Sequence, residues 1–128
     1  MTDVQKAAEL AGRTLMAVMF LKTGVGKITA YAGTQAYMAA AGVPGTLLPF
    51  VIALEVLGGL ALIAGYRTRL VSIALAVFTV MAGLLFHNQL ADQMQQVMFL
   101  KNLAIAGGFL ILAVHGAGAW SIDGRRTT

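Results

Sequence analysis

Glu55 is the residue whose position most strongly suggests a chemical role, because it interrupts a long apolar segment. The run from Leu47 to Tyr66, LLPFVIALEVLGGLALIAGY, is otherwise long and apolar enough to cross a bilayer. A carboxylate within a membrane costs roughly several kcal/mol, so it is retained only where it has a partner or a task. We therefore expect Glu55 to face the protein interior and to pair with a basic side chain.

Three lysines in other apolar segments could supply that partner, and we slightly prefer Lys101. Asn102 beside it can donate hydrogen bonds to a ligand, and His87 can exchange protons, as can Glu55 itself. The candidate ligand or proton site therefore contains Glu55, Lys22, Lys27, His87, Lys101 and Asn102. A structural alternative stays open for each residue: a lysine that only neutralises Glu55, a lysine that extends to the membrane surface, or an interfacial histidine.

Four apolar segments would position these residues as transmembrane helices. They span residues 11–28, 47–66, 70–87 and 97–115, each within the length that a membrane helix uses. The first is the weakest, because Arg13, Lys22 and Lys27 interrupt it. Between the first two, residues 35–41 predict a short helix with Thr34 as its N-cap, lying at the membrane interface. A plain connector is the alternative for this segment.

Composition indicates an all-α integral membrane protein, a four-helix bundle forming one domain over residues 1–128. Apolar residues make up 59% of the chain and charged residues only 11%, too few to cover a soluble domain of this length. The absence of cysteine excludes disulfides, iron–sulfur clusters and thiolate zinc sites. The net charge of +4 is spread between apolar runs, which argues against a nucleic-acid partner and for a lipid bilayer.

The distribution of basic residues predicts that both termini are cytoplasmic. The face that carries the termini would hold six basic residues and the opposite face three. The six are Lys6, Arg13, Arg67, Arg69, Arg125 and Arg126. The tight turn with Arg67 and Arg69 weighs most, and Trp120 would be an interfacial anchor on the same side. Glu55 would then lie about 12 Å below the outer surface, at the helical rise from Leu47. The polar candidates would thus gather in the outer half of the bundle.

The two histidines argue against common cofactor sites. His87 and His115 lie at opposite ends of their spans, so they do not form a bis-histidine haem site. On the outer side only Glu55 and His87 could bind a metal, which is too few ligands for a metal centre. We expect no metal and no intrinsic cofactor.

Several segments together resemble the DoxX family over nearly the whole chain. They are FLKTGVGKIT from Phe20, YAGTQAYMAAAGVPG from Tyr31, ALEVLGGLALIAGYRTR from Ala53, LLFH from Leu84 and FLKNLAIAGGFL from Phe99. The resemblance implies a four-helix bacterial inner-membrane protein. The family takes its name from a small membrane subunit associated with quinol or thiosulfate–quinone oxidation, and other members are linked to resistance to quinones, aromatic electrophiles and oxidative stress. The positions that match the family's recurrent polar pattern are Lys27, Glu55, Arg69, His87, Lys101 and Asn102.

Three functions are consistent with these observations. The first is binding of a quinone or similar aromatic compound in the outer half, linked to redox chemistry or detoxification. The second is a non-enzymatic subunit or assembly factor whose polar cluster only holds the helices in register. The third is a small exporter of aromatic compounds. A redox activity would make the protein an oxidoreductase-associated subunit with a membrane or redox partner, and a homo-oligomer is a further candidate assembly. No catalytic residue is assigned.

Overall fold

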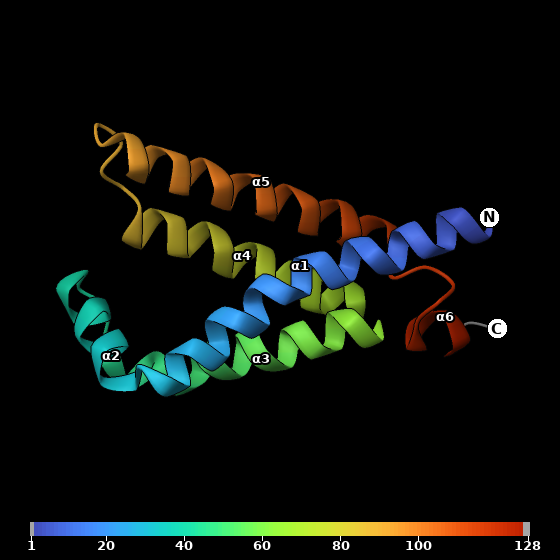
Figure 1. The fold of residues 1–128 in the computed structure, drawn as a ribbon, viewed down its shortest axis with the longest axis horizontal. Coiled ribbons are helices and arrows are strands. Elements are labelled where there is room, and N and C mark those ends of the chain that lie inside the picture. The colour runs from blue at the N-terminus through green and yellow to red at the C-terminus, as the bar shows by residue number, and fades with distance from the viewer. Residues whose placement is uncertain (1, 127–128) are drawn as a thin grey trace. The chain divides into compact units, whose positions relative to one another are not determined.

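The computed structural model describes residues 2–126, apart from the side chain of Arg126, and all regular secondary structure in this part of the chain is helical. Its helices are α1 (Asp3–Thr29), α2 (Tyr31–Ala40), α3 (Leu48–Ala64), α4 (Thr68–Phe86), α5 (Gln93–His115) and α6 (Ile122–Arg126), with a 3₁₀ turn, η1 (Gly45–Leu47), before α3. They form two compact units (Figure 1). The first unit contains the chain up to Tyr66 together with the C-terminal segment from Ala117, and the second is Arg67–Gly116.

Local signals in the sequence explain where these helices begin and end. Thr2 and Gln5 form a reciprocal capping box at the start of α1. The side chain of Asp92 caps the start of α5 by accepting from Met94 N at 2.9 Å. Gly65 ends α3 with a φ of 70°, a left-handed conformation in which a side chain would be strained.

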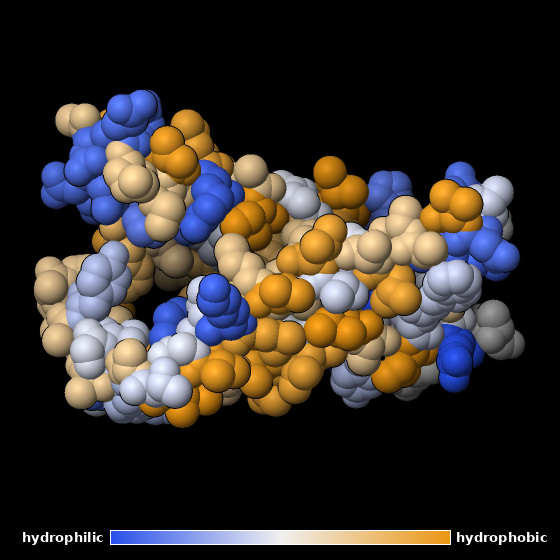
Figure 2. Space-filling model, viewed as in Figure 1, coloured by the Kyte–Doolittle hydropathy of each residue, from blue (hydrophilic) through white to orange (hydrophobic). Residues whose placement is uncertain are grey.

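Three helices are long and apolar enough to span a membrane: Gly45–Ala64, Thr68–Phe86 and Gln93–His115. They correspond to the second, third and fourth predicted spans. The first predicted span, 11–28, lies within α1 and is helical. However, α1 carries too many charged residues to count as a candidate membrane span. The all-α class is therefore confirmed, and three of the four predicted spans have the length and composition of a membrane helix, whereas the four-helix bundle is not confirmed. Figure 2 shows hydrophobic residues over much of α3 and hydrophilic residues at the α4–α5 turn.

The connecting helix α2 differs from its prediction at its N-terminus. It begins at Tyr31, with only Ala30 between it and α1, rather than at residue 35. Thr34 is not an N-cap, because it lies inside the helix and its hydroxyl donates to Ala30 O at 2.8 Å. Tyr31 and Tyr37 are exposed, and Met38 is buried.

In the first unit, α1 and α3 run antiparallel and close together along the segment that carries Glu55 (Figure 1). Glycines on both helices allow this approach. A Cβ added at Gly59 would lie 2.8 Å from Leu21 Cγ and 3.3 Å from the Ala17 carbonyl oxygen. Only glycine fits such a contact without displacing the neighbouring helix.

Arg13 joins three parts of the first unit. It is 2% exposed, and its guanidinium donates to Leu62 O at 2.7 Å and to Ile63 O at 3.0 Å, the last carbonyls of α3. It also donates to Trp120 O at 2.6 Å in the C-terminal segment. A cation is favourable at a helix C-terminus, where carbonyl groups lack partners. Arg13 thus fixes the end of α3 and the C-terminal segment to α1.

The C-terminal segment is also held by its own contacts. Asp123 N donates to Gly65 O at 2.8 Å, and Ser121 is 8% exposed against the end of α3. Ser121 Oγ accepts from Gly124 N at 2.9 Å. The start of α1 and α6 consequently lie at the same end of this unit (Figure 1).

The second unit is an antiparallel pair, α4 and α5, with a comparable arginine. Arg69 Nη1 donates to Val114 O at 2.6 Å, near the end of α5. Farther along the pair, a Cβ at Gly83 would lie 3.3 Å from Asn102 Cβ, so the two helices are in close contact there. Each unit therefore has an arginine on its first long helix that binds the terminal carbonyls of its second.

Candidate functional site

Glu55 lies near the middle of α3 and is buried against α1, with 2% of the residue exposed. The side of α1 that faces it carries Gly24. A Cβ at position 24 would be 3.1 Å from Glu55 Cβ and 2.8 Å from Val56 Cγ2. The absence of a side chain at Gly24 therefore makes room for the carboxylate between the two helices.

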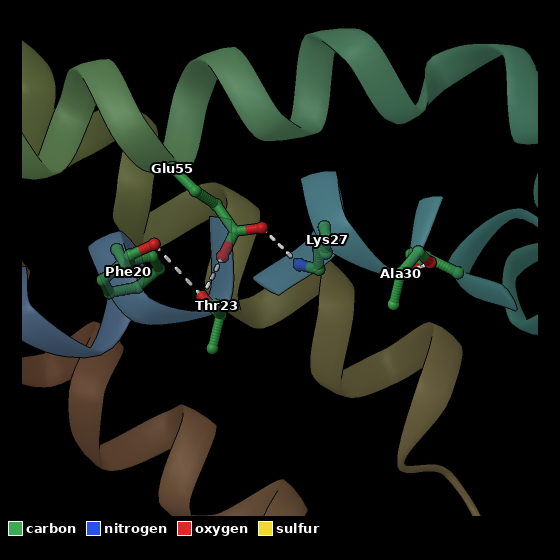
Figure 3. Close-up of polar contacts among 6 residues, drawn as sticks. Phe20, Thr23, Lys27, Ala30 and Glu55 are labelled. Atoms are coloured by element: carbon green, nitrogen blue, oxygen red, sulfur yellow. Dashed lines mark hydrogen bonds and ion pairs between the residues drawn. The ribbon is translucent and has the colours of Figure 1, made fainter. Parts of the chain in front are cut away.

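Two side chains of α1 satisfy the carboxylate, one on each oxygen (Figure 3). Lys27 Nζ forms an ion pair with Glu55 Oε1, and Thr23 Oγ1 makes a hydrogen bond with Oε2. These residues lie four apart and on one face of the helix, on either side of Gly24. The expectation that Glu55 turns inward and pairs with a lysine is confirmed. The partner in the structure is Lys27, whereas the sequence slightly favoured Lys101.

The two members of the ion pair differ in their access to the surroundings. The side chain of Glu55 is 3% exposed, whereas that of Lys27 is 28% exposed. A lysine ammonium has three N–H donors, and the ion pair uses one of them. Lys27 is thus the member of the pair that a molecule approaching α1 can reach, while Glu55 is reached only through its neighbours.

Three further candidates belong to the second unit, where they make separate contacts. Asn102 is 8% exposed, and its Nδ2 donates to Thr79 O at 3.1 Å. Lys101, the adjacent residue, is exposed on α5. His87 is half-buried, with Nδ1 3.2 Å from Gln95 Oε1 at the turn between α4 and α5. None of these contacts joins two of the predicted site residues to each other.

The other predicted residues do not take part in the Glu55 contacts that the structure describes. Lys22 is exposed on α1, five residues from Lys27 and so on a different face. Trp120 is 45% exposed, and its carbonyl accepts from Arg13. Arg67 has a φ of 47° in the turn before α4. The topological roles predicted for Arg67, Arg69 and Trp120 stay predictions.

Sequence reasoning missed two residues of the first unit. Thr23 was not among the predicted site residues. Its spacing of four from Lys27, which places both residues on one helix face, was the signal that could have identified it. Arg13 was treated as a basic residue marking the cytoplasmic face, and its burial depends on carbonyl groups far away in the sequence. Within residues 2–126, no three histidine, aspartate or glutamate side chains are close enough to form a metal site.

Comparison with known proteins identifies the family of this chain. The family model described as DoxX matches residues 8–88, which include Thr23, Lys27 and Glu55. The chain belongs to the DoxX family. It is 50% identical over 123 residues to the inner membrane protein YqjF of Escherichia coli (strain K12), covering 96% of this chain and 95% of that protein.

A second E. coli protein, the inner membrane protein YphA, is 32% identical over 123 residues, covering 91% of this chain and 88% of YphA. The ER-derived vesicles protein ERV29 of Saccharomyces cerevisiae is 28% identical over 82 residues, covering 60% of this chain and 26% of ERV29. No solved structure matches the chain. Family membership and three apolar helices of spanning length identify a membrane protein.

Proposed function

We propose that this DoxX-family protein resides in the bacterial inner membrane and binds a small aromatic carbonyl compound of the quinone type beside Lys27. The names of YqjF and YphA support the location. The observation that carries the ligand proposal is the ion pair between buried Glu55 and partly exposed Lys27. Charged side chains within apolar helices are costly, and such residues commonly mark binding or proton-transfer sites.

The chemistry of the pair suits a ligand with carbonyl oxygens. The ammonium of Lys27 keeps donors beyond the one used by Glu55, and a quinone oxygen accepts hydrogen bonds. Glu55 lies behind Lys27, where its carboxylate accepts from the lysine and can exchange a proton when a quinone is converted to a quinol. The proposal covers binding and proton exchange. Conversion of a quinone to a quinol consumes two protons and two electrons, and in a redox role a membrane partner would supply the electrons.

A structural brace is the second candidate function, and one observation favours it. Both oxygens of Glu55 have partners within the α1–α3 pair, and Gly24 brings the two helices into contact at the same point. An ion pair with these contacts fixes the register of two helices even when no ligand binds. The protein would then be a non-enzymatic subunit or assembly factor.

Direct binding measurements distinguish the two functions. The full-length protein in lipid nanodiscs is titrated with menadione, a small naphthoquinone, by isothermal titration calorimetry, with empty nanodiscs as the blank. We expect saturable binding by the wild-type protein and at least a tenfold loss, about 1.4 kcal/mol, in Lys27→Met, measured at a temperature at which circular dichroism shows that the variant is folded. Lys22→Met is the matched control, because it removes an exposed lysine from the same helix. Only non-saturable partitioning by wild type, or equal binding by wild type and Lys27→Met, would exclude the ligand site.

A further inference from the structure

Thr23 places a single hydroxyl group between two hydrogen-bond acceptors (Figure 3). Its Oγ1 contacts Glu55 Oε2 and also lies 3.2 Å from the carbonyl oxygen of Phe20, one turn earlier in α1. A threonine hydroxyl has one proton to donate and two lone pairs to accept with. It can therefore serve only one of the two acceptors as a donor at any time.

With Glu55 ionised, the direction of the hydrogen bonds is fixed by chemistry. A carboxylate can only accept, so Thr23 donates to Oε2 and Lys27 donates to Oε1. Both buried oxygens are then satisfied by charge-assisted hydrogen bonds, which are about twice as strong as neutral ones.

With Glu55 protonated, rotation of the Thr23 hydroxyl is enough to give the same atoms hydrogen-bond partners. A proton on Oε2 makes that oxygen a donor, and Thr23 Oγ1 becomes its acceptor. The hydroxyl proton of Thr23 then points to Phe20 O, 3.2 Å away. Both oxygens of the buried Glu55 keep a partner, and Thr23 itself is exposed on α1, so the usual penalty for an unpaired buried group is avoided.

We infer that Thr23 is a positioning residue that allows Glu55 to gain and lose a proton inside the α1–α3 pair. The inference deepens the proposed function, on which it rests, by giving the carboxylate two satisfied protonation states. Glu55 Oε2 gains the proton from the surroundings through the hydroxyl of Thr23 and later returns it by the same route, and no electron is transferred.

The charges around Glu55 are compatible with both states. Lys27 is the charged residue that contacts Glu55 from α1, and the segment from Ala30 to Leu47, which includes α2 and η1, carries no charged residue. When Glu55 becomes neutral, Lys27 loses its counter-charge. Because its side chain is 28% exposed, the ammonium can be compensated by solvent or by polar lipid groups.

Infrared difference spectroscopy of the full-length protein in nanodiscs tests this role. The absorption band of a protonated carboxyl group is recorded across about pH 4 to 10, and the band lost in Glu55→Gln is assigned to Glu55. In Thr23→Val, we expect the Glu55 band to shift in frequency, because the protonated carboxyl group loses the oxygen that accepts its hydrogen bond. Thr23→Ser keeps the hydroxyl and should return the band to its wild-type position.

A second threonine supplies a matched control. Thr29 lies on the same helix and its hydroxyl donates to Gly26 O at 2.9 Å, but its hydrogen bond involves no carboxylate. Thr29→Val should leave the Glu55 band in place. The inference is overturned by the absence of a titrating Glu55 band in the wild type, by an unchanged band in Thr23→Val, by a failure of Thr23→Ser to restore it, or by an equal shift in Thr29→Val.

The same variants separate this inference from the proposed function. The infrared band is measured without added quinone, and menadione binding is measured in parallel. A shift in Thr23→Val without saturable menadione binding by the wild type would support the proton role of Thr23 and reject the quinone ligand. Binding that depends on Lys27, together with an unchanged band in Thr23→Val, would support the ligand site and reject the role of Thr23.

Discussion

Gly24 of α1 lies against Glu55 of α3 at the point where the two helices are in close contact. A Cβ at Gly24 would be 3.1 Å from Glu55 Cβ and 2.8 Å from Val56 Cγ2. Thr23 and Lys27, which hold the carboxylate, lie on either side of this glycine. The ion pair therefore depends on a contact between helices that only a residue without a side chain allows.

Replacing Gly24 with alanine should separate α1 from α3 and weaken the Glu55 contacts. We expect Gly24→Ala to destabilise the protein by about 1–3 kcal/mol, the usual cost of overpacking. Thermal unfolding in detergent, followed by circular dichroism, measures the effect. Gly26→Ala is the control, because a Cβ there meets nothing within 4 Å and alanine favours the helix. Equal melting temperatures for Gly24→Ala and Gly26→Ala would contradict the prediction.

The two members of the ion pair should differ in the cost of their removal. Lys27→Met leaves a carboxylate that is 3% exposed without its counter-charge, which should cost about 3–5 kcal/mol. Glu55→Gln keeps the size of the side chain and leaves a lysine that is 28% exposed, so about 1 kcal/mol is expected. The double variant should recover most of the stability lost in Lys27→Met. Unfolding of all three by denaturant tests this order, and a larger loss in Glu55→Gln than in Lys27→Met would refute it.

The apolar runs predicted the C-terminal ends of the long helices to within two residues. The starts of two helices were predicted too late: α1 begins at Asp3 rather than at residue 11, and α5, capped by Asp92, begins at Gln93 rather than at residue 97. The prediction for Thr34 was wrong because α2 follows α1 after a single residue, so Thr34 lies inside a helix instead of starting one. A capping preference is overridden when the preceding residues are already helical.

The sequence predicted that Glu55 pairs with a lysine, but it did not identify which lysine. The cost of a charge in an apolar helix indicates that a basic partner exists. Which lysine it is depends on the rotation of α1 about its own axis, and that rotation is set by the close approach at Gly24. Lys22 and Lys27 lie on different faces of α1, and composition alone does not choose between them. The burial of Arg13 depends in the same way on carbonyl groups that tertiary packing brings to it.

The orientation of the protein in the membrane remains a sequence prediction with a direct test. The excess of basic residues on one side predicts that both termini are cytoplasmic. A fused reporter active only in the cytoplasm should therefore be active at the C-terminus, and one active only in the periplasm should be inactive. Expression of both fusions is compared by immunoblotting as the control. Activity of the periplasmic reporter would reverse the orientation and place Glu55 in the inner half.

Arg13 should stabilise the first unit through its geometry more than through its charge. The guanidinium reaches two carbonyls at the end of α3 and the Trp120 carbonyl at once, which a single ammonium group cannot reproduce. We expect Arg13→Lys, which preserves the charge that determines topology, to lose about 2–3 kcal/mol of stability. Arg69→Lys is the matched control: Arg69 also binds carbonyls near a helix end, but it is exposed, so a smaller loss is expected. Thermal unfolding and limited proteolysis of the C-terminal segment measure both variants. Equal stability and equal protection of that segment in wild type and Arg13→Lys would show that the charge alone suffices.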